Sequence, residues 1–189
     1  MSIKQEILKY SRQETMQPLS PWFDAQLDQL IDNGTYSDLN TLEDTGRKLV
    51  SELIAYGSKY NIHTVALGMS GGVDSALTAA MFKQAGWRVV GVTMPIHQNP
   101  EETARGIEAC KALGINHIQV DLTEQYEQAL ANARKYDTTI DDSTSAIRRG
   151  NLRVRTRMMT VYNIASMERG LVGSTDNFSE LAAGFWTLH

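Results

Sequence analysis

Residues 70–75 read Ser-Gly-Gly-Val-Asp-Ser and combine two glycines with two hydroxyl groups and one carboxylate. Gly71 and Gly72 allow a sharp turn and a close approach to a ligand, because neither residue carries a Cβ atom. The stretch follows an apolar run, residues 64–67, and precedes a helical pattern that begins at about Asp74. A turn of this kind directs free N–H groups and the positive end of a helix into one pocket. The stretch therefore predicts an anion site, and phosphate is the anion that such sites most often bind.

The remaining side chains of this stretch refine the prediction. Ser70 and Ser75 add hydroxyl donors. Asp74 would repel a phosphate unless a divalent cation lies between them, and a carboxylate oxygen is a suitable ligand for that cation. The stretch lacks the Gly-Lys-Ser/Thr sequence of a Walker A loop, which disfavours transfer of a γ-phosphoryl group. The alternative is a glycine-rich turn between a strand and a helix, in which Asp74 only caps the helix.

The elements that must position this stretch alternate in type. Short runs rich in valine and isoleucine predict strands at 64–69, 88–94, 117–122 and 170–175, separated by predicted helices at 74–86, 99–114 and 145–169. Such alternation is typical of βαβ units, so we expect an α/β fold with a parallel sheet and helices on both faces. Ligands of these sheets bind at the carboxyl ends of the strands, where residues 70–75 would lie.

The N-terminal third predicts helices without strands. Residues 3–60 have helical patterns, and Ser20 and Pro21 are suited to the N-cap and first positions of one helix. We expect residues 1–62 to pack on the sheet, so that residues 1–189 form a single domain.

Composition excludes several function classes. The 189 residues carry a formal net charge of -4, which provides no basic field for nucleic acid. The N-terminus lacks the apolar region of a signal peptide, and no run of about 18 apolar residues predicts a membrane span. The single cysteine, Cys110, cannot form an internal disulfide, and we expect it to pack as a small apolar residue. We therefore expect a soluble, cytoplasmic protein.

The string Ser-Gly-Gly-Val-Asp-Ser, between a strand and a helix, resembles the pyrophosphate-binding loop of the N-type ATP pyrophosphatase superfamily. The resemblance implies a Rossmann-like, adenine nucleotide α-hydrolase-like fold and an enzyme that cleaves ATP between its α- and β-phosphates to adenylate a substrate. Three later segments, Asn-Leu-Arg-Val-Arg-Thr-Arg-Met (151–158), Thr-Asp-Asn-Phe-Ser-Glu (175–180) and Gly-Phe-Trp-Thr (184–187), are similar in sequence and spacing to the NAD synthetase family.

This second resemblance implies roles for individual residues. The expected ATP contacts are Ser70, Gly71, Gly72, Asp74, Ser75 and Thr175. Asp74 and Glu180 match two magnesium ligands, and Arg155 matches an arginine that contacts deamido-NAD. The resemblance assigns no catalytic residue. Two carboxylates on two strand-end loops could together hold a metal ion that neutralises crowded anions.

The family implies ATP-dependent amidation of deamido-NAD to NAD through an acyl-adenylate, with Mg²⁺ required, AMP and pyrophosphate released, and a homodimer that binds deamido-NAD at its interface. Leu188 replaces a lysine common in ammonia-dependent members, but no glutaminase domain precedes the synthetase part, so we expect ammonia as the nitrogen donor. Ser174 replaces a usual glycine and is expected to tighten its loop. Family members continue past the position of His189, so we expect ATP–magnesium binding with little turnover from these 189 residues. Alternatives are another adenylating amidotransferase or tRNA-modifying enzyme, or a nucleotide-binding module without turnover.

Residues 148–157 contain five arginines. On a helix, Arg149, Arg153 and Arg157 share one side, whereas Arg148 and Arg155 lie on another. A charge run usually forms a solvated face, but a solvated face would not need both rows. The alternative to a solvated face is that one row meets the anionic dinucleotide, and the remaining arginines could pair with acidic residues across a dimer interface.

Overall fold

The computed structural model describes residue 5 and residues 20–33, 39–177, 179–180 and 187. The chain divides into two compact units, residues 1–49 and 50–189. Helix α2 (Pro21–Asp32) begins directly after Ser20, as predicted, and α3 (Leu39–Tyr60) begins in the first unit and ends in the second. The packing of residues 1–62 on the sheet stays a prediction, and the helical pattern within residues 6–19 lies outside the described residues.

The second unit contains a four-stranded parallel sheet in the order β3-β2-β1-β4. Its strands are β1 (Thr64–Gly68), β2 (Arg88–Thr93), β3 (Asn116–Gln119) and β4 (Leu171–Val172). Each strand falls within or overlaps a run predicted from its valine and isoleucine content. The two central strands pair over five residues, from Thr64↔Arg88 to Gly68↔Val92. They read as nearly continuous apolar runs because both of their faces are buried.

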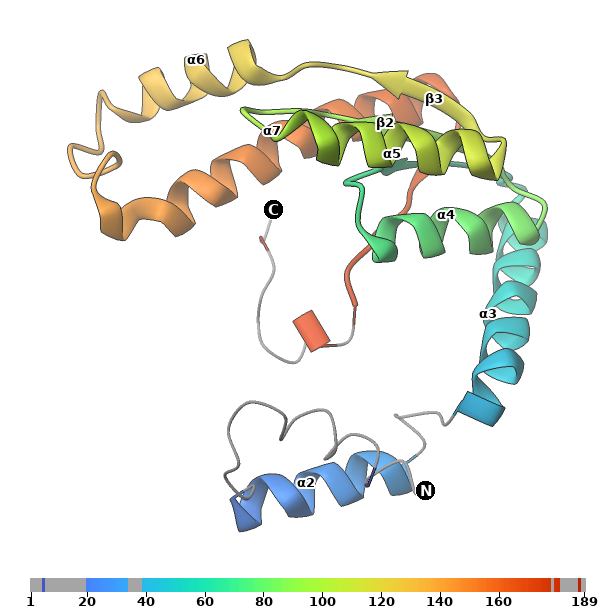
Figure 1. Ribbon diagram of the computed structural model, residues 1–189. Helices are drawn as coiled ribbons and strands as arrows, with labels where there is room; N and C mark the ends of the chain where they lie inside the picture. The colour runs from blue at the N-terminus through green and yellow to red at the C-terminus, as the bar shows by residue number, and fades with distance from the viewer. Residues whose placement is uncertain (1–4, 6–19, 34–38, 178, 181–186, 188–189) are drawn as a thin grey trace. The chain divides into compact units, whose positions relative to one another are not determined.

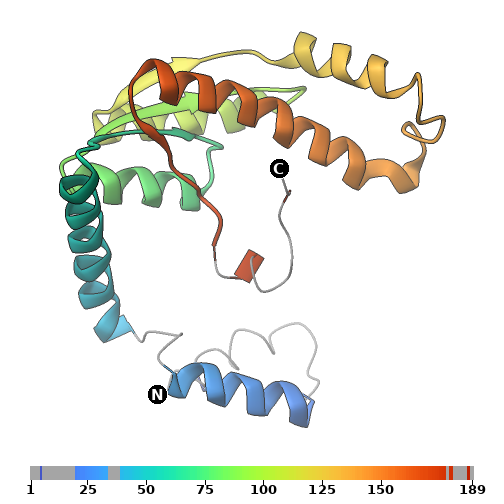
Figure 2. The same cartoon turned by 180° about the vertical axis from the view of Figure 1, so that it is seen from behind.

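Helices cover both faces of the sheet, as predicted. Helices α4 (Val73–Gln84) and α5 (Pro100–Leu113) lie on one face, and α6 (Thr123–Ala133) and α7 (Ala146–Met167) lie on the other (Figures 1 and 2). The strand side chains alternate between two cores. Val65 and Leu67 pack in the core that contains Ala79 of α4, whereas Ala66 packs in the core that contains Ile164 of α7. Helix α6 was not predicted from the sequence.

Helix α5 packs closely against β2. It begins after Asn99, whose side chain accepts a hydrogen bond from Glu101 N at 3.1 Å, and Pro100 occupies its first position. A Cβ atom at Gly91 of β2 would lie 2.6 Å from Cys110 Sγ, so glycine is required for this approach. Cys110 itself is fully buried, as predicted, and burial raises the pKa of its thiol.

Within the described part of the chain, no helix has the length and apolar character needed to cross a membrane.

Candidate functional site

The loop that follows β1 has a backbone that only glycine can adopt without strain. Gly71 has φ +86°, in the left-handed region. A Cβ atom at this position would also lie 2.3 Å from the carbonyl oxygen of Glu102, in the first turn of α5. The loop and α5 are therefore in direct contact, and this contact fixes where the loop can present its N–H groups.

The two serines of the motif have different positions. Ser75 is 1% exposed, and its hydroxyl donates to the Gly72 carbonyl at 3.0 Å. The Ser75 hydroxyl also lies 3.2 Å from that of Ser70, which accepts a hydrogen bond from Gly72 N at 3.2 Å. Ser75 thus holds the loop from inside rather than lining the cavity, and its predicted contact with ATP stays a prediction.

Helix α4 begins directly after this loop without a side-chain cap. Gly72 occupies the N-cap position in an extended conformation and has no side chain that could accept from the first turn. The N–H groups of that turn therefore remain available to an external acceptor. An anion at this helix end would also be stabilised by the helix dipole.

A cavity of about 960 Å³ lies at the carboxyl ends of the strands. Its lining comes from the segments after β1, β2 and β4, from α5, and from α7, as expected for an open parallel sheet. Of the predicted site residues, four line it: Ser70, Gly71, Gly72 and Thr175. Apolar and aromatic side chains contribute as well: Met69, Val92, Met94, Ile96, Val154, Met158, Val161, Tyr162 and Val172.

Two of the five clustered arginines line this cavity. Arg157 of α7 donates from Nε to the Met94 carbonyl at 3.0 Å and from Nη2 to Gln98 Oε1 at 3.3 Å. The guanidinium of Arg153 lies over the Tyr126 ring, 5.1 Å from its centroid. Burial lowers the pKa of Arg157, and the positive charge of Arg153 lowers it further. The row predicted as 149, 153 and 157 is therefore the one that faces the cavity, through its last two members.

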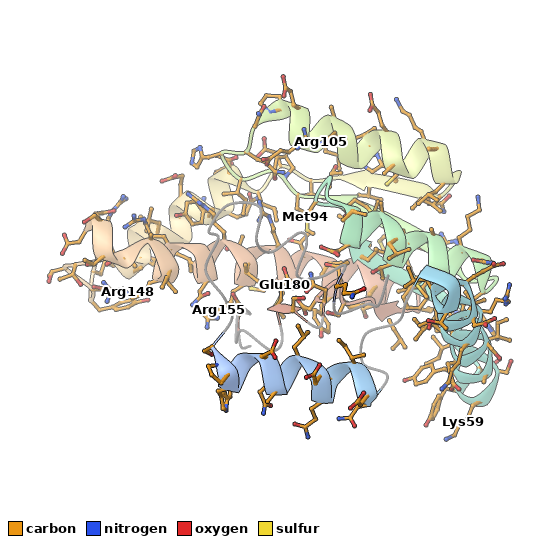
Figure 3. The ribbon with its side chains drawn as sticks, turned by 60° about the horizontal axis from the view of Figure 1, so that its bottom comes forward. Lys59, Met94, Arg105, Arg148, Arg155 and Glu180 are labelled. Atoms are coloured by element: carbon orange, nitrogen blue, oxygen red, sulfur yellow. The ribbon has the colours of Figure 1, made fainter. Side chains whose placement is uncertain are left out.

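The other arginines of the run have different surroundings. Arg149 donates to the carbonyls of Ile140 and Asp142 at 2.6 and 2.8 Å. Arg148 forms an ion pair with Asp137 at 3.3 Å. Arg155 belongs to α7 (Figure 3). It is exposed and is not part of the cavity lining. Its predicted contact with deamido-NAD stays a prediction.

The two predicted magnesium ligands also lie off the cavity lining. Asp74 is exposed in the first turn of α4. The carboxylate of Glu180 accepts from Asn177 N at 3.0 Å, while Asn177 Oδ1 accepts from Glu180 N at 2.9 Å. Among the described residues, no three histidine, cysteine, aspartate or glutamate side chains form a metal-binding group. One or two carboxylates suffice when phosphate oxygens and water complete the shell, as is usual for Mg²⁺, so this donor set fits the ion.

The loop after β4 brings Thr175 to the cavity. Gly173 N donates to the Ala66 carbonyl at 2.9 Å, which continues the contact between β4 and β1. Ser174 Oγ donates to Asp176 Oδ2 at 2.6 Å and accepts from Asp176 N at 3.3 Å. Ser174 therefore tightens this loop, as expected from its sequence. Leu188 lies outside the described residues.

Further polar residues on the lining were not predicted, among them His97, Glu102 and Arg105. His97 Nε2 lies 2.6 Å from Glu127 Oε1 of α6. Glu102 and Arg105 lie one turn apart on α5, close to Gly71. The sequence offers one signal for Glu102 and Arg105, the N-cap pattern at Asn99. This pattern places both residues near the start of a helix that faces the strand ends.

Comparison with protein families identifies the family of this chain. The model of the NAD synthase family matches residues 46–189. The chain belongs to the NAD synthase family. It is 35% identical over 129 residues to an NH(3)-dependent NAD(+) synthetase of Alkaliphilus metalliredigens, a match that covers 66% of this chain and 52% of that relative. The chain thus spans about half the length of these curated relatives.

Solved structures of the NAD synthase family and its neighbours share this fold. An NMN synthetase from Francisella tularensis superimposes with a TM-score of 0.69 at 27% identity, covering 77% of this chain and 58% of that one. A glutamine-dependent NAD+ synthetase from Acinetobacter baumannii, solved with ADP, gives a TM-score of 0.72 at 25% identity, covering 81% of this chain and 29% of that one. The predicted Rossmann-like α/β fold is confirmed.

Proposed function

We propose that this NAD synthase family chain takes part in ATP-dependent amidation of deamido-NAD to NAD. The carboxylate of the nicotinate ring is adenylated, AMP and pyrophosphate are released, and ammonia supplies the nitrogen. The observation that carries this proposal is the Ser70–Gly72 loop, which opens into the cavity at an uncapped helix end.

The loop suits the phosphates of ATP. Its N–H groups and the first turn of α4 provide donors for several oxygens, and Ser70 adds a hydroxyl. No lysine is present in residues 68–75, so the loop lacks the side chain that stabilises a transferring γ-phosphoryl group in Walker A proteins. The apolar wall formed by Met69, Met94 and Ile96 suits a flat aromatic base.

Asp74 and Glu180 would hold Mg²⁺ with the phosphates. Both carboxylates belong to segments that follow strand ends, β1 for Asp74 and β4 for Glu180. When bound, the ion neutralises charge that would otherwise oppose the approach of one anion to another. Glu180 would give up its hydrogen bond from Asn177 N for this role.

The carboxylate substrate would contact Arg155 at a homodimer interface. Arg155, Met159 and Tyr162 lie four and three residues apart on α7 and therefore share one face. Met159 is 69% exposed and Tyr162 is 53% exposed, which is unusual for large apolar side chains on the same helix face. A second copy of the chain would cover this face and place Arg155 beside the ligand.

Ammonia is proposed because the curated relatives carry it in their names. The Alkaliphilus metalliredigens and Carboxydothermus hydrogenoformans proteins are both called NH(3)-dependent NAD(+) synthetases. The Acinetobacter baumannii neighbour is instead called glutamine-dependent, and this chain covers 29% of its length.

The decisive experiment supplies ATP, Mg²⁺ and deamido-NAD with either ammonium or glutamine, and follows AMP, pyrophosphate and NAD together. Formation of all three products with ammonium alone supports the proposal. AMP and pyrophosphate without NAD support adenylation but oppose amidation by this chain. Binding of ATP without any product selects a nucleotide-binding module, and products that require tRNA or another acceptor select a different adenylating enzyme.

The Francisella tularensis neighbour, called an NMN synthetase, favours a second candidate substrate. The same chemistry would then act on nicotinate mononucleotide, which carries the same ring carboxylate. A parallel reaction with that compound decides between the two by the ratio of their kcat/KM values.

A further inference from the structure

Two guanidinium groups of the cavity wall lie close together and form no direct ion pair with a carboxylate of the described residues. Arg153 and Arg157 are one turn apart on α7 and both line the cavity. Two adjacent like charges oppose each other, and partial burial makes this repulsion stronger than in water.

Arg153 is the less satisfied of the two. Its Nε is buried and has no hydrogen-bond partner within the described residues. The Tyr126 ring, itself 2% exposed, faces the guanidinium at 5.1 Å and offers only the attraction of its π electrons. A buried donor left without an acceptor lowers stability, so such a group in a folded protein calls for a ligand or a structural reason.

Arg157 is fixed in orientation by neutral acceptors, and the negative charge of Glu102, which also lines the cavity, acts on it without a direct ion pair. Its two hydrogen bonds go to neutral acceptors, the Met94 carbonyl and the Gln98 side chain. These contacts hold the guanidinium at the end of β2, whereas the Ser70–Gly72 loop follows β1. Since β1 and β2 are adjacent parallel strands, the arginine pair and the loop approach the same cavity from neighbouring strand ends.

We infer that Arg153 and Arg157 form a second oxyanion-binding site in this cavity, distinct from the Ser70–Gly72 loop, which takes a phosphoryl or carboxylate group of a substrate. The inference rests on the proposed function only for the identity of that substrate. A phosphate of ATP and the ring carboxylate or diphosphate of deamido-NAD have the same chemistry towards a guanidinium pair.

The test compares Arg153→Met with the unsubstituted chain. Methionine fills a similar volume without a buried charge. Isothermal titration with ATP plus Mg²⁺, with deamido-NAD and with inorganic pyrophosphate measures the affinity for each anion, and thermal unfolding without ligand measures stability. We expect at least one affinity to fall by about tenfold or more, while the melting temperature stays the same or rises. Arg153→Lys should retain part of the affinity.

Arg149→Met is the matched control. Arg149 belongs to the same row of α7, but its guanidinium donates to two backbone carbonyls away from the cavity. Its replacement should lower the melting temperature and leave all three affinities unchanged in the folded protein. The two variants are therefore expected to change stability and binding in opposite ways.

The ligand whose affinity falls identifies the source of the oxyanion. A loss confined to ATP assigns the pair to a phosphate of the nucleotide, and a loss confined to deamido-NAD assigns it to the carboxylate substrate. If neither nucleotide binds the unsubstituted chain, the proposed function fails, but pyrophosphate binding that depends on Arg153 still supports the site. Equal binding of every anion by Arg153→Met and the unsubstituted chain overturns the inference, as does a chain that binds no anion.

Discussion

At the scale of single residues, the loop depends on Gly71 for two separable reasons. Its φ of +86° would strain any other residue, and a Cβ atom would collide with the Glu102 carbonyl. Gly86 provides a comparison, because it has φ +80° but no atom within 4 Å of where its Cβ would lie. A side chain at Gly71 would therefore cause both backbone strain and a collision, whereas a side chain at Gly86 would cause backbone strain alone.

We predict that Gly71→Ala loses more stability than Gly86→Ala. Each should lose about 1–3 kcal/mol from backbone strain, and Gly71→Ala should lose more because the loop or α5 must move. Chemical denaturation measures both losses. Titration with ATP and Mg²⁺ should show weaker binding only for Gly71→Ala. Equal losses in the two variants would mean that α5 yields freely and does not fix the loop.

Asp74 gives a second prediction at this scale. Asp74→Asn keeps the shape of the side chain but removes the charge that faces Mg²⁺ in the proposed site. We expect ATP binding to weaken and to lose most of its dependence on Mg²⁺ concentration, as measured by titration at several concentrations of the ion. Glu108→Gln, an equivalent change on the exposed side of α5, should behave as the unsubstituted chain. Unchanged Mg²⁺ dependence in Asp74→Asn would remove Asp74 from the site.

At the scale of elements, α7 is held at its start by contacts that do not involve the cavity. Arg148 and Arg149 bind the segment between α6 and α7, and Arg134 at the end of α6 donates to both carboxylate oxygens of Asp141 at 2.8 and 3.0 Å. These contacts fix the rotation of α7 about its axis. That rotation in turn decides which arginines face the sheet.

The Arg134–Asp141 pair predicts an acid dependence. Hydrogen bonds from Arg134 lower the pKa of Asp141 below its ordinary value of 3.8. Because the pKa of Asp141 is lower in the folded state than in the unfolded state, the pair contributes stability that is fully present above the unfolded-state pKa. This stability is lost as the pH falls through the folded-state pKa. Denaturation at about pH 6 and about pH 3 should therefore show a smaller acid loss for Asp141→Asn than for the unsubstituted chain. Asp142→Asn serves as the control, and an equal reduction there would contradict this assignment.

The sequence predicted the features that depend on local residue patterns and missed those that depend on contacts between distant segments. Valine and isoleucine runs identify strands because buried central strands need apolar side chains on both faces, and all four strands were predicted. The glycine motif identified the loop because its backbone requirement is local. The arginine run predicted two rows, but periodicity cannot say which row faces the sheet, since that depends on contacts between α7 and segments distant in sequence. For the same reason the burial of Ser75 and the positions of Glu102 and Arg105 were not predicted.

At the scale of the whole molecule, assembly and substrate binding should be linked if deamido-NAD lies at a dimer interface. Met159→Glu places a charge on the exposed face that contains Arg155 and Tyr162. We expect this variant to be a monomer by light scattering, with weaker deamido-NAD binding and unchanged ATP binding. Arg155→Ala should weaken deamido-NAD binding by about 1.5–3 kcal/mol without preventing dimerisation.

Tyr136→Glu is the control for this prediction. Tyr136 is 82% exposed and lies in the turn after α6, outside α7. Its replacement should alter neither assembly nor binding. Dimers that persist in Met159→Glu, or equal weakening of both nucleotides, would place the interface elsewhere.

The short ladder between β1 and β4 has a kinetic consequence. Val65 pairs with Leu171 and Ala66 with Val172. These two residue pairs close a long loop of the chain, which contains strands β2 and β3. Closure of such a long loop is entropically unfavourable, which makes this edge the last part of the sheet to form and the first to open. Amide hydrogens of 171–173 should therefore exchange with solvent faster than those of 89–92. A nucleotide that contacts Thr175 should slow hydrogen exchange at this edge more than elsewhere in the sheet. Ligand binding would then stabilise the part of the sheet that forms last.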